Sequence, residues 1–287
     1  MNHYQNEDFI GERALFRCHD AKIENCVFHD GESPLKEGRN LTIQNCTFQY
    51  KYPLWYGRNH RVENCKFELM SRSGIWYTED SFFSNCEIIA PKEFRRCRNL
   101  KLENIVFHDA GETLWSCENI TLSSILAKGD YLLKDSNNLT IENLKLDGNY
   151  AFDGCRNIKI KNSILNTKDA FWNCKDVTLE NCIVKGEYFG WNSTDITMRN
   201  CEISSHQGFC YMKNLVMKDC KISDSDLIFE YCENIDCDIH SHLSSVKNPI
   251  SGVLKAYDID TLIFDDERIH RDSISIFVRK GDIYEKI

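Results

Sequence analysis

The sequence predicts an all-β protein, a right-handed parallel β-helix (solenoid) of about 12 rungs with terminal caps. Three observations lead to this prediction. The segment CKDVTLENCIV at residues 174–184 recurs in related forms, nearly every copy alternates apolar with polar residues, and every copy carries Asn or Asp two residues after its first position. A fixed period of this length is typical of a solenoid, in which each repeat forms one coil.

The first position of the repeat, here called the Cys position, recurs every 19 to 21 residues. It is occupied in turn by Cys18, Gly38, Gly57, Thr78, Cys97, Cys117, Ser136, Cys155, Cys174, Ser193, Met212 and Cys232. The Asn or Asp that follows it, and a second Asn five residues later in most copies, tolerate left-handed backbone and can hydrogen-bond along a stack. We therefore expect two polar ladders at corners of the coils.

Each repeat predicts three short strands. In the copy at residues 174–184 the first strand holds Val177 and Leu179 two residues apart, and the second is Cys182–Val184. A third segment, such as Ala170–Asn173, completes the coil. Residues 1–10 are expected to form an N-terminal cap, residues 11–239 the β-helix, and residues 240–287 an irregular rung and C-terminal cap of the same domain.

The composition narrows the class of partner. Among 287 residues the net charge is −9 and the pI is about 5.5, without a run of Lys or Arg, so neither nucleic acid nor a membrane surface is an expected partner. The first residues lack an apolar run, so we expect no signal peptide and a cytoplasmic protein. No phosphate loop or dinucleotide fingerprint is present, and no cofactor is expected.

The fifteen cysteines follow the repeat and exchange with small apolar residues, which is typical of buried reduced thiols. No Cys-x-x-Cys pair occurs, so no zinc or other metal site is expected. His240 and His242 would lie on one side of a strand, but the sequence shows no third ligand beside them.

An aromatic column carries the strongest functional signal. All five tryptophans, Trp55, Trp76, Trp115, Trp172 and Trp191, lie two residues before the Cys position, and Tyr56 and Tyr77 follow two of them. The preceding position is almost entirely apolar and must face inward, so the tryptophans should face outward, interleaved with charges. Two interpretations stay open: the rings bind the faces of sugars, or loops fold over them and bury them.

Charged residues in and beside this column are the candidate catalytic groups: Arg95, Glu112, Lys134, Asp135, Asp153 and Asp169. Carboxylate pairs on neighbouring coils could serve glycoside hydrolysis, and Lys or Arg beside them could serve β-elimination of a uronate. Charge pairing between coils would explain the same residues without catalysis.

Several short runs carry a resemblance to a known family: GERALF (11–16), DGESPLKE (30–37), KYPLWY (51–56), GIWYT (74–78), DAFWNC (169–174) and KNPISG (247–252). They resemble an uncharacterised bacterial family known as a domain of unknown function (DUF3737), which is similar in fold to pectin-lyase-like β-helix proteins. The resemblance implies the fold over essentially the whole chain, and the family offers no catalytic residues to transfer.

Together these features predict an uncharacterised β-helix protein that binds or processes an oligosaccharide or another polar cyclic ligand on its aromatic and charged column. The alternative is a non-catalytic scaffold for protein interactions, which could form a homodimer. The sequence leaves open whether the protein is an enzyme. If it is one, a carbohydrate-active hydrolase or lyase is expected.

Overall fold

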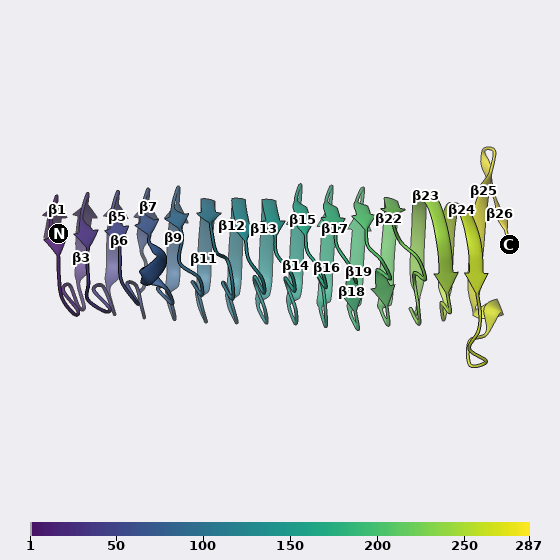
Figure 1. The fold of residues 1–287 in the computed structure, drawn as a ribbon, viewed down its shortest axis with the longest axis horizontal. Helices are drawn as coiled ribbons and strands as arrows, with labels where there is room; N and C mark the ends of the chain where they lie inside the picture. Colours follow the sequence, from purple (N-terminus) through teal and green to yellow (C-terminus); the bar gives the residue numbers. More distant parts are fainter. Residues whose placement is uncertain (1) are drawn as a thin grey trace. The chain divides into compact units, whose positions relative to one another are not determined.

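The computed structural model describes residues 2–287 and confirms an all-β parallel β-helix, with about 15 coils. The chain divides into two compact units, one ending at Gly148 and the other beginning at Asn149. Within each unit the strands of successive coils lie side by side (Figure 1). Among the described residues no helix has both the length and the apolar character needed to cross a membrane.

In the first unit most coils contain a longer strand, then a corner, then a short strand. The strands are β1 (Asn2–Gln5), β2 (Asp8–Phe9), β3 (His19–Glu24), β4 (Val27–Phe28), β5 (Arg39–Gln44), β6 (Thr47–Phe48), β7 (Arg61–Glu63), β8 (Lys66–Phe67), β9 (Glu79–Ser84), β10 (Glu87–Ile88), β11 (Arg98–Phe107), β12 (Glu118–Lys128) and β13 (Asn137–Asp147), with a 3-10 turn η1 (Leu69–Ser71). Each pairs in parallel with its equivalent one coil on, as His19 does with Arg39 and Leu100 with Ile120.

The second unit repeats this arrangement. Its strands are β14 (Arg156–Lys161), β15 (Ile164–Asn166), β16 (Lys175–Glu180), β17 (Ile183–Lys185), β18 (Gly190–Trp191), β19 (Thr194–Arg199), β20 (Glu202–Ser204), β21 (Phe209–Cys210), β22 (Lys213–Ser223), β23 (Ile235–Lys247), β24 (Gly252–Ile263), β25 (Ile274–Lys280) and β26 (Ile283–Lys286), with η2 at Arg271–Ser273. The ladder stays parallel as far as the pairing of β24 with β25, and β26 then folds back antiparallel on β25.

The coils extend beyond both ends of the repeat seen in the sequence. Residues 2–9, within the segment expected as an N-terminal cap, form β1 and β2, which pair with β3 and β4 as a further coil. At the other end, β24 and β25 add coils within residues 240–287. The count of 12 is therefore too low, because these end coils keep the strand pairing and lose the Cys and Asn signature.

The expected third strand is found as a strand in the described coils only at β18 and β21, which pair with each other. Elsewhere this segment turns tightly, since residues such as Phe94, Leu114 and Phe152 have positive φ. A left-handed residue interrupts the extended backbone that a strand requires. The coil therefore closes through a series of turns on this side.

The two polar ladders are present as predicted. Asn59 donates to Asn40, which donates to Asp20, at 2.9 and 2.7 Å, and both asparagines have φ near 55°. The second ladder runs through bonds such as Asn104 to Asn85 at 2.7 Å. Each amide thus satisfies its neighbour while its own backbone takes the left-handed turn.

The core consists of stacked apolar columns. Phe28, Phe48 and Phe67 lie with ring centroids 4.9 Å apart, one coil after the next. In the second unit Phe152 and Phe171 stack at 5.1 Å. All fifteen cysteines are free and buried, as the exchange with apolar residues predicted.

Candidate functional site

In the first unit the aromatic column is a continuous stack of rings and a guanidinium. Trp55 and Trp76 are parallel within 11°, with centroids 5.4 Å apart. The Arg95 guanidinium lies between the next two indoles, 5.1 Å from the Trp76 ring and 4.4 Å from the Trp115 ring. The predicted alignment of these tryptophans in one column is therefore present within this unit.

The indoles are neither fully exposed nor fully buried. Each indole N–H donates to a backbone carbonyl of the following coil: Trp55 to Ser73, Trp76 to Lys92 at 2.9 Å, and Trp115 to Tyr131. These bonds fix the side chains against the turns of the next coil. The turns cover part of each indole and leave the rest accessible. The rings are thus neither fully open to a sugar nor fully covered by loops, the two arrangements that the sequence left open.

Tyr56 and Tyr77 form a second stack beside the tryptophans. Their rings are 4.7 Å apart and parallel within 4°, and Tyr56 is 47% exposed. Lys36 from the preceding coil lies 5.7 Å from the Tyr56 ring, and Arg96 from the following coil lies 6.0 Å from the Tyr77 ring. Since neighbours occupy the ring faces along the stack, the tyrosines turn their edges to solvent. This differs from the expected presentation of free aromatic faces.

These tyrosines line a groove of about 790 Å³, here called the Tyr56 groove, a size typical of ligand sites. Its walls are Arg17, His19, Lys36, Glu37, Arg39, Tyr56, Gly57, Arg58, Tyr77 and Glu79. The basic residues His19, Arg39 and Arg58 follow the Cys position by one residue in three successive coils. Sequence reasoning missed them because it did not follow this column, although the period that revealed the tryptophans would also reveal them.

In the second unit the stack is less regular. Trp172 and Trp191 are 6.3 Å apart and tilted by 52°, and Trp191, 42% exposed, lies 5.1 Å from Tyr211. The Trp172 indole nitrogen is buried and has no hydrogen-bond partner among the described residues.

Of the six predicted catalytic residues, the structure brings Arg95 and Glu112 together. Arg95 forms an ion pair with the Glu112 carboxylate, and Lys92 approaches the same carboxylate to 3.2 Å. Partial burial raises the pKa of Glu112, but the hydrogen bonds from Lys92 and Arg95 outweigh it and lower the pKa overall. A carboxylate held ionised by two cations is better suited to fixing the ladder than to donating a proton.

The other four lie apart from this pair in the chain. Lys134 and Asp135 belong to the next coil, where the Lys134 carbonyl accepts the Ser116 N–H at 2.9 Å. Asp153 and Asp169 belong to the second unit. Asp153 accepts a bond from Asn173 at 3.3 Å, while Asp169 is buried, and this burial raises its pKa to about 6.

Besides the cysteines, two titratable side chains of the first unit, Glu93 and His60, lie in the core. Glu93 has no exposed surface; one carboxyl oxygen accepts the Gly74 N–H at 2.8 Å and the other has no partner among the described residues. His60 is also buried, and neither of its ring nitrogens has a hydrogen-bond partner among the described residues. Its ring packs against Gly57, where a larger residue would clash with it. Glu93 and His60 both occupy inward-facing positions of the coil.

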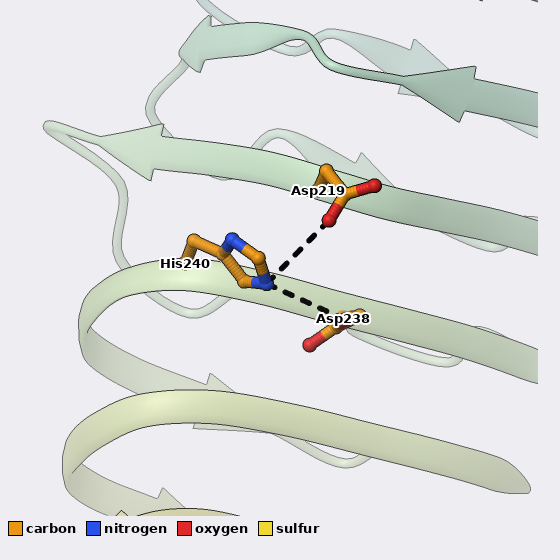
Figure 2. A group of neighbouring side chains, drawn as sticks. All are labelled: Asp219, Asp238 and His240. Atoms are coloured by element: carbon orange, nitrogen blue, oxygen red, sulfur yellow. Dashed lines mark ion pairs between the residues drawn. The ribbon is translucent and has the colours of Figure 1, made fainter. Parts of the chain in front are cut away.

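Figure 2 shows a cluster that sequence reasoning missed: His240, Asp238 and Asp219, with His240 Nε2 3.4 Å from Asp238 and 3.9 Å from Asp219. Its ligand atoms lie within 4.8 Å of one another, as do those of His242, Asp258 and Asp260. The expectation that these histidines lack a third potential ligand is therefore wrong. Asp219 comes from β22, one coil before His240, and only strand pairing brings them together.

The fold and these columns define the class: a parallel β-helix protein with an aromatic and cationic ladder. Within that class, residues 2–277 match the model of the family described as "Protein of unknown function (DUF3737)", and the chain belongs to this family.

Among solved structures, the chain is similar to the tailspike protein of E. coli bacteriophage HK620 in complex with a pentasaccharide, with 10% identity and a TM-score of 0.43. That match covers 91% of this chain and 62% of the tailspike chain. The mannuronan C-5 epimerase AlgE4 A-module of Azotobacter vinelandii gives 10% identity and a TM-score of 0.43, covering 96% of this chain and 89% of that one. No relative matches among curated proteins.

Proposed function

We propose that the protein binds an oligosaccharide, or a similar polar cyclic ligand, in the Tyr56 groove of its first unit. The observation that carries this proposal is the stacked pair of Tyr56 and Tyr77 along a groove lined by hydrogen-bonding side chains. Sugars combine apolar ring surfaces with many hydroxyl groups. A wall of aromatic edges alternating with guanidinium and carboxylate groups matches both features.

The groove is also preorganised. Tyr56 is held by Tyr77, and Trp55 behind it is fixed by stacking on Trp76 and by its bond to Ser73. Side chains that are ordered before binding lose little conformational entropy when a ligand arrives. Because the groove crosses several coils, which are spaced about 4.8 Å apart, it suits an extended ligand with a repeating unit.

Tryptophan fluorescence tests this proposal. Trp55 lies 6.2 Å from Tyr56 between ring centroids, so a ligand in the groove should change its emission. We expect saturable changes with at least one member of an oligosaccharide panel, and Tyr56→Ala should weaken binding about tenfold. The control is Tyr257→Ala in the second unit, because Tyr257 is 39% exposed and also lies under a cation, Arg279, at 5.0 Å.

If no oligosaccharide in a broad panel changes the emission, and calorimetry detects no heat of binding, the proposal is wrong. A mass in solution above that of the monomer would then favour the interaction scaffold. Equal loss of affinity in Tyr56→Ala and Tyr257→Ala would place the binding site elsewhere.

A further inference from the structure

We propose that the ligand of the Tyr56 groove is an anionic oligosaccharide, whose sugars carry carboxylate or sulfate groups. This inference rests on the proposed function and adds the charge class of the ligand to it.

The charge of the groove is opposite to that of the whole chain. Its walls hold four cations, Arg17, Lys36, Arg39 and Arg58, against the two carboxylates Glu37 and Glu79, while the chain as a whole carries a net charge of −9. A local excess of positive charge in a hollow raises the concentration of anions there. In an acidic protein, such an excess beside the stacked tyrosines favours an anionic ligand.

These cations are available to a ligand. Among the residues that the structure describes, Lys36 and Arg39 form no salt bridge. Arg17 pairs with Glu37 at 2.8 Å and Arg58 with Asp80 at 3.1 Å, but the two arginine side chains are 65% and 58% exposed. Exposed ion pairs contribute little free energy, so an anionic group can replace the carboxylate at small cost.

The cations also follow the coil. Arg39 and Arg58 are neighbours in the parallel ladder, and Arg17 lies on the coil before Arg39, where its N–H donates to the Lys36 carbonyl. Each of three successive coils therefore carries at least one cation. The step between them is about 4.8 Å. This step is close to the length of one sugar residue in an extended chain, so a ligand with one acid group per sugar can meet one cation per coil.

A matched set of ligands tests the inference by calorimetry: β-1,4-linked oligoglucuronate, the neutral cello-oligosaccharide of the same length, and its sulfated derivative. At low salt we expect the two anionic ligands to bind about tenfold more tightly than the neutral one. The difference should shrink at 1 M salt, where screening acts within about 3 Å. Comparing the carboxylate with the sulfate identifies which anion the groove prefers.

Variants localise the effect. Lys36→Gln combined with Arg39→Gln should reduce the affinity for the anionic ligands to that for the neutral one. Arg156→Gln combined with Lys159→Gln, which removes one exposed arginine and one exposed lysine from β14, should leave it unchanged. Circular dichroism melting checks that both double variants are folded.

Equal affinity for neutral and anionic ligands would overturn this inference and leave the proposed function standing. Absence of binding by all three ligands, and by the wider panel, would overturn both. Binding of linear polyphosphate as tight as that of oligoglucuronate, and unaffected by Tyr56→Ala, would show unspecific charge attraction and also overturn the inference.

Discussion

Glu93 places a carboxyl group at an inward position where the neighbouring coils have small residues. Its equivalents in neighbouring coils are Gly74 and Thr113, and a side chain on Gly74 would lie 2.7 Å from the Glu93 carboxyl oxygen. Burial raises the pKa of Glu93 well above its usual range, against the smaller opposing effect of the backbone N–H groups of Gly74 and Ile75. The native state therefore holds a neutral carboxyl group in the core.

Glu93→Gln should stabilise the protein at neutral pH. An unfolded glutamate loses its proton above pH 4.5, whereas the native one keeps it, so native stability falls as pH rises through this range. The glutamine variant lacks this loss, so we expect it to be more stable than the original protein at pH 7 and to lose this advantage near pH 4. Urea denaturation at both pH values measures it. Glu103→Gln is the control, because the Glu103 side chain is 47% exposed. A destabilised Glu93→Gln at pH 7 would contradict the prediction.

His60 shows the opposite dependence. Burial lowers its pKa from 6.5 to about 4. Between these values the unfolded chain binds the proton and the native chain does not, so stability falls as pH falls from 6.5 to 4. The full effect corresponds to about 3 kcal/mol.

His60→Leu should remove most of this acid sensitivity, since the equivalent positions one coil before and two coils after hold Leu41 and Leu100. The measurement is the difference in unfolding free energy between pH 4.5 and pH 7.5. Equal pH dependence in the variant and the original protein would show that His60 titrates as an exposed group.

At the scale of elements, the Asn ladders fix the corners. Asn99 has φ 53°, donates to Asp80 at 2.7 Å and accepts from Asn119 at 2.8 Å. The hydrogen bond from Asn99 is also the main cause that lowers the pKa of Asp80. The same side chain thus satisfies two neighbours and permits the left-handed turn.

Asn99→Ala should cost about 2 kcal/mol, because it loses these bonds and places an alanine in a left-handed conformation. Asn99→Gly should cost less, since glycine adopts this conformation without strain. Thermal unfolding ranks the two variants against Asn166→Ala, an exposed asparagine at the end of β15. An alanine variant as stable as the glycine variant would contradict the role of backbone conformation.

The strands themselves follow from the sequence, but the closing segment of each coil does not. Alternation at Val177 and Leu179 identifies a strand because both side chains enter the core. The segment that carries the tryptophans has the same kind of alternation, yet it contains left-handed residues such as Leu114 and Ser116. Composition alone does not reveal these dihedral angles when the residues are neither Gly nor Asn.

At the scale of the whole chain, the fifteen buried thiols allow the packing of the core to be tested by chemical labelling. A thiol reagent should label almost none of them in the native protein and all fifteen in denaturant, because each side chain points into the core. The absorbance of the released chromophore counts them. Rapid labelling of several cysteines without denaturant would contradict the packing described here.

The division at Gly148 and Asn149 had no counterpart in the sequence prediction. The Cys position continues across it, from Ser136 to Cys155, at the usual spacing. A repeat records which residues share a column, and it does not show where the chain divides into compact units. The end coils escaped prediction for a related reason, since strand pairing at β1 and β25 needs no Cys or Asn signature.

The sequence by itself determined the coil and its columns, because a period near 19 residues places equivalent side chains above one another. It thereby identified the Asn ladders, the buried cysteines and the line of Trp55, Trp76 and Trp115. Only the tertiary structure decided which column members are buried, paired or open. Glu93 and Arg95 are two residues apart, yet one lies in the core and the other between two indoles. That difference depends on what the neighbouring coils present, which no single repeat contains.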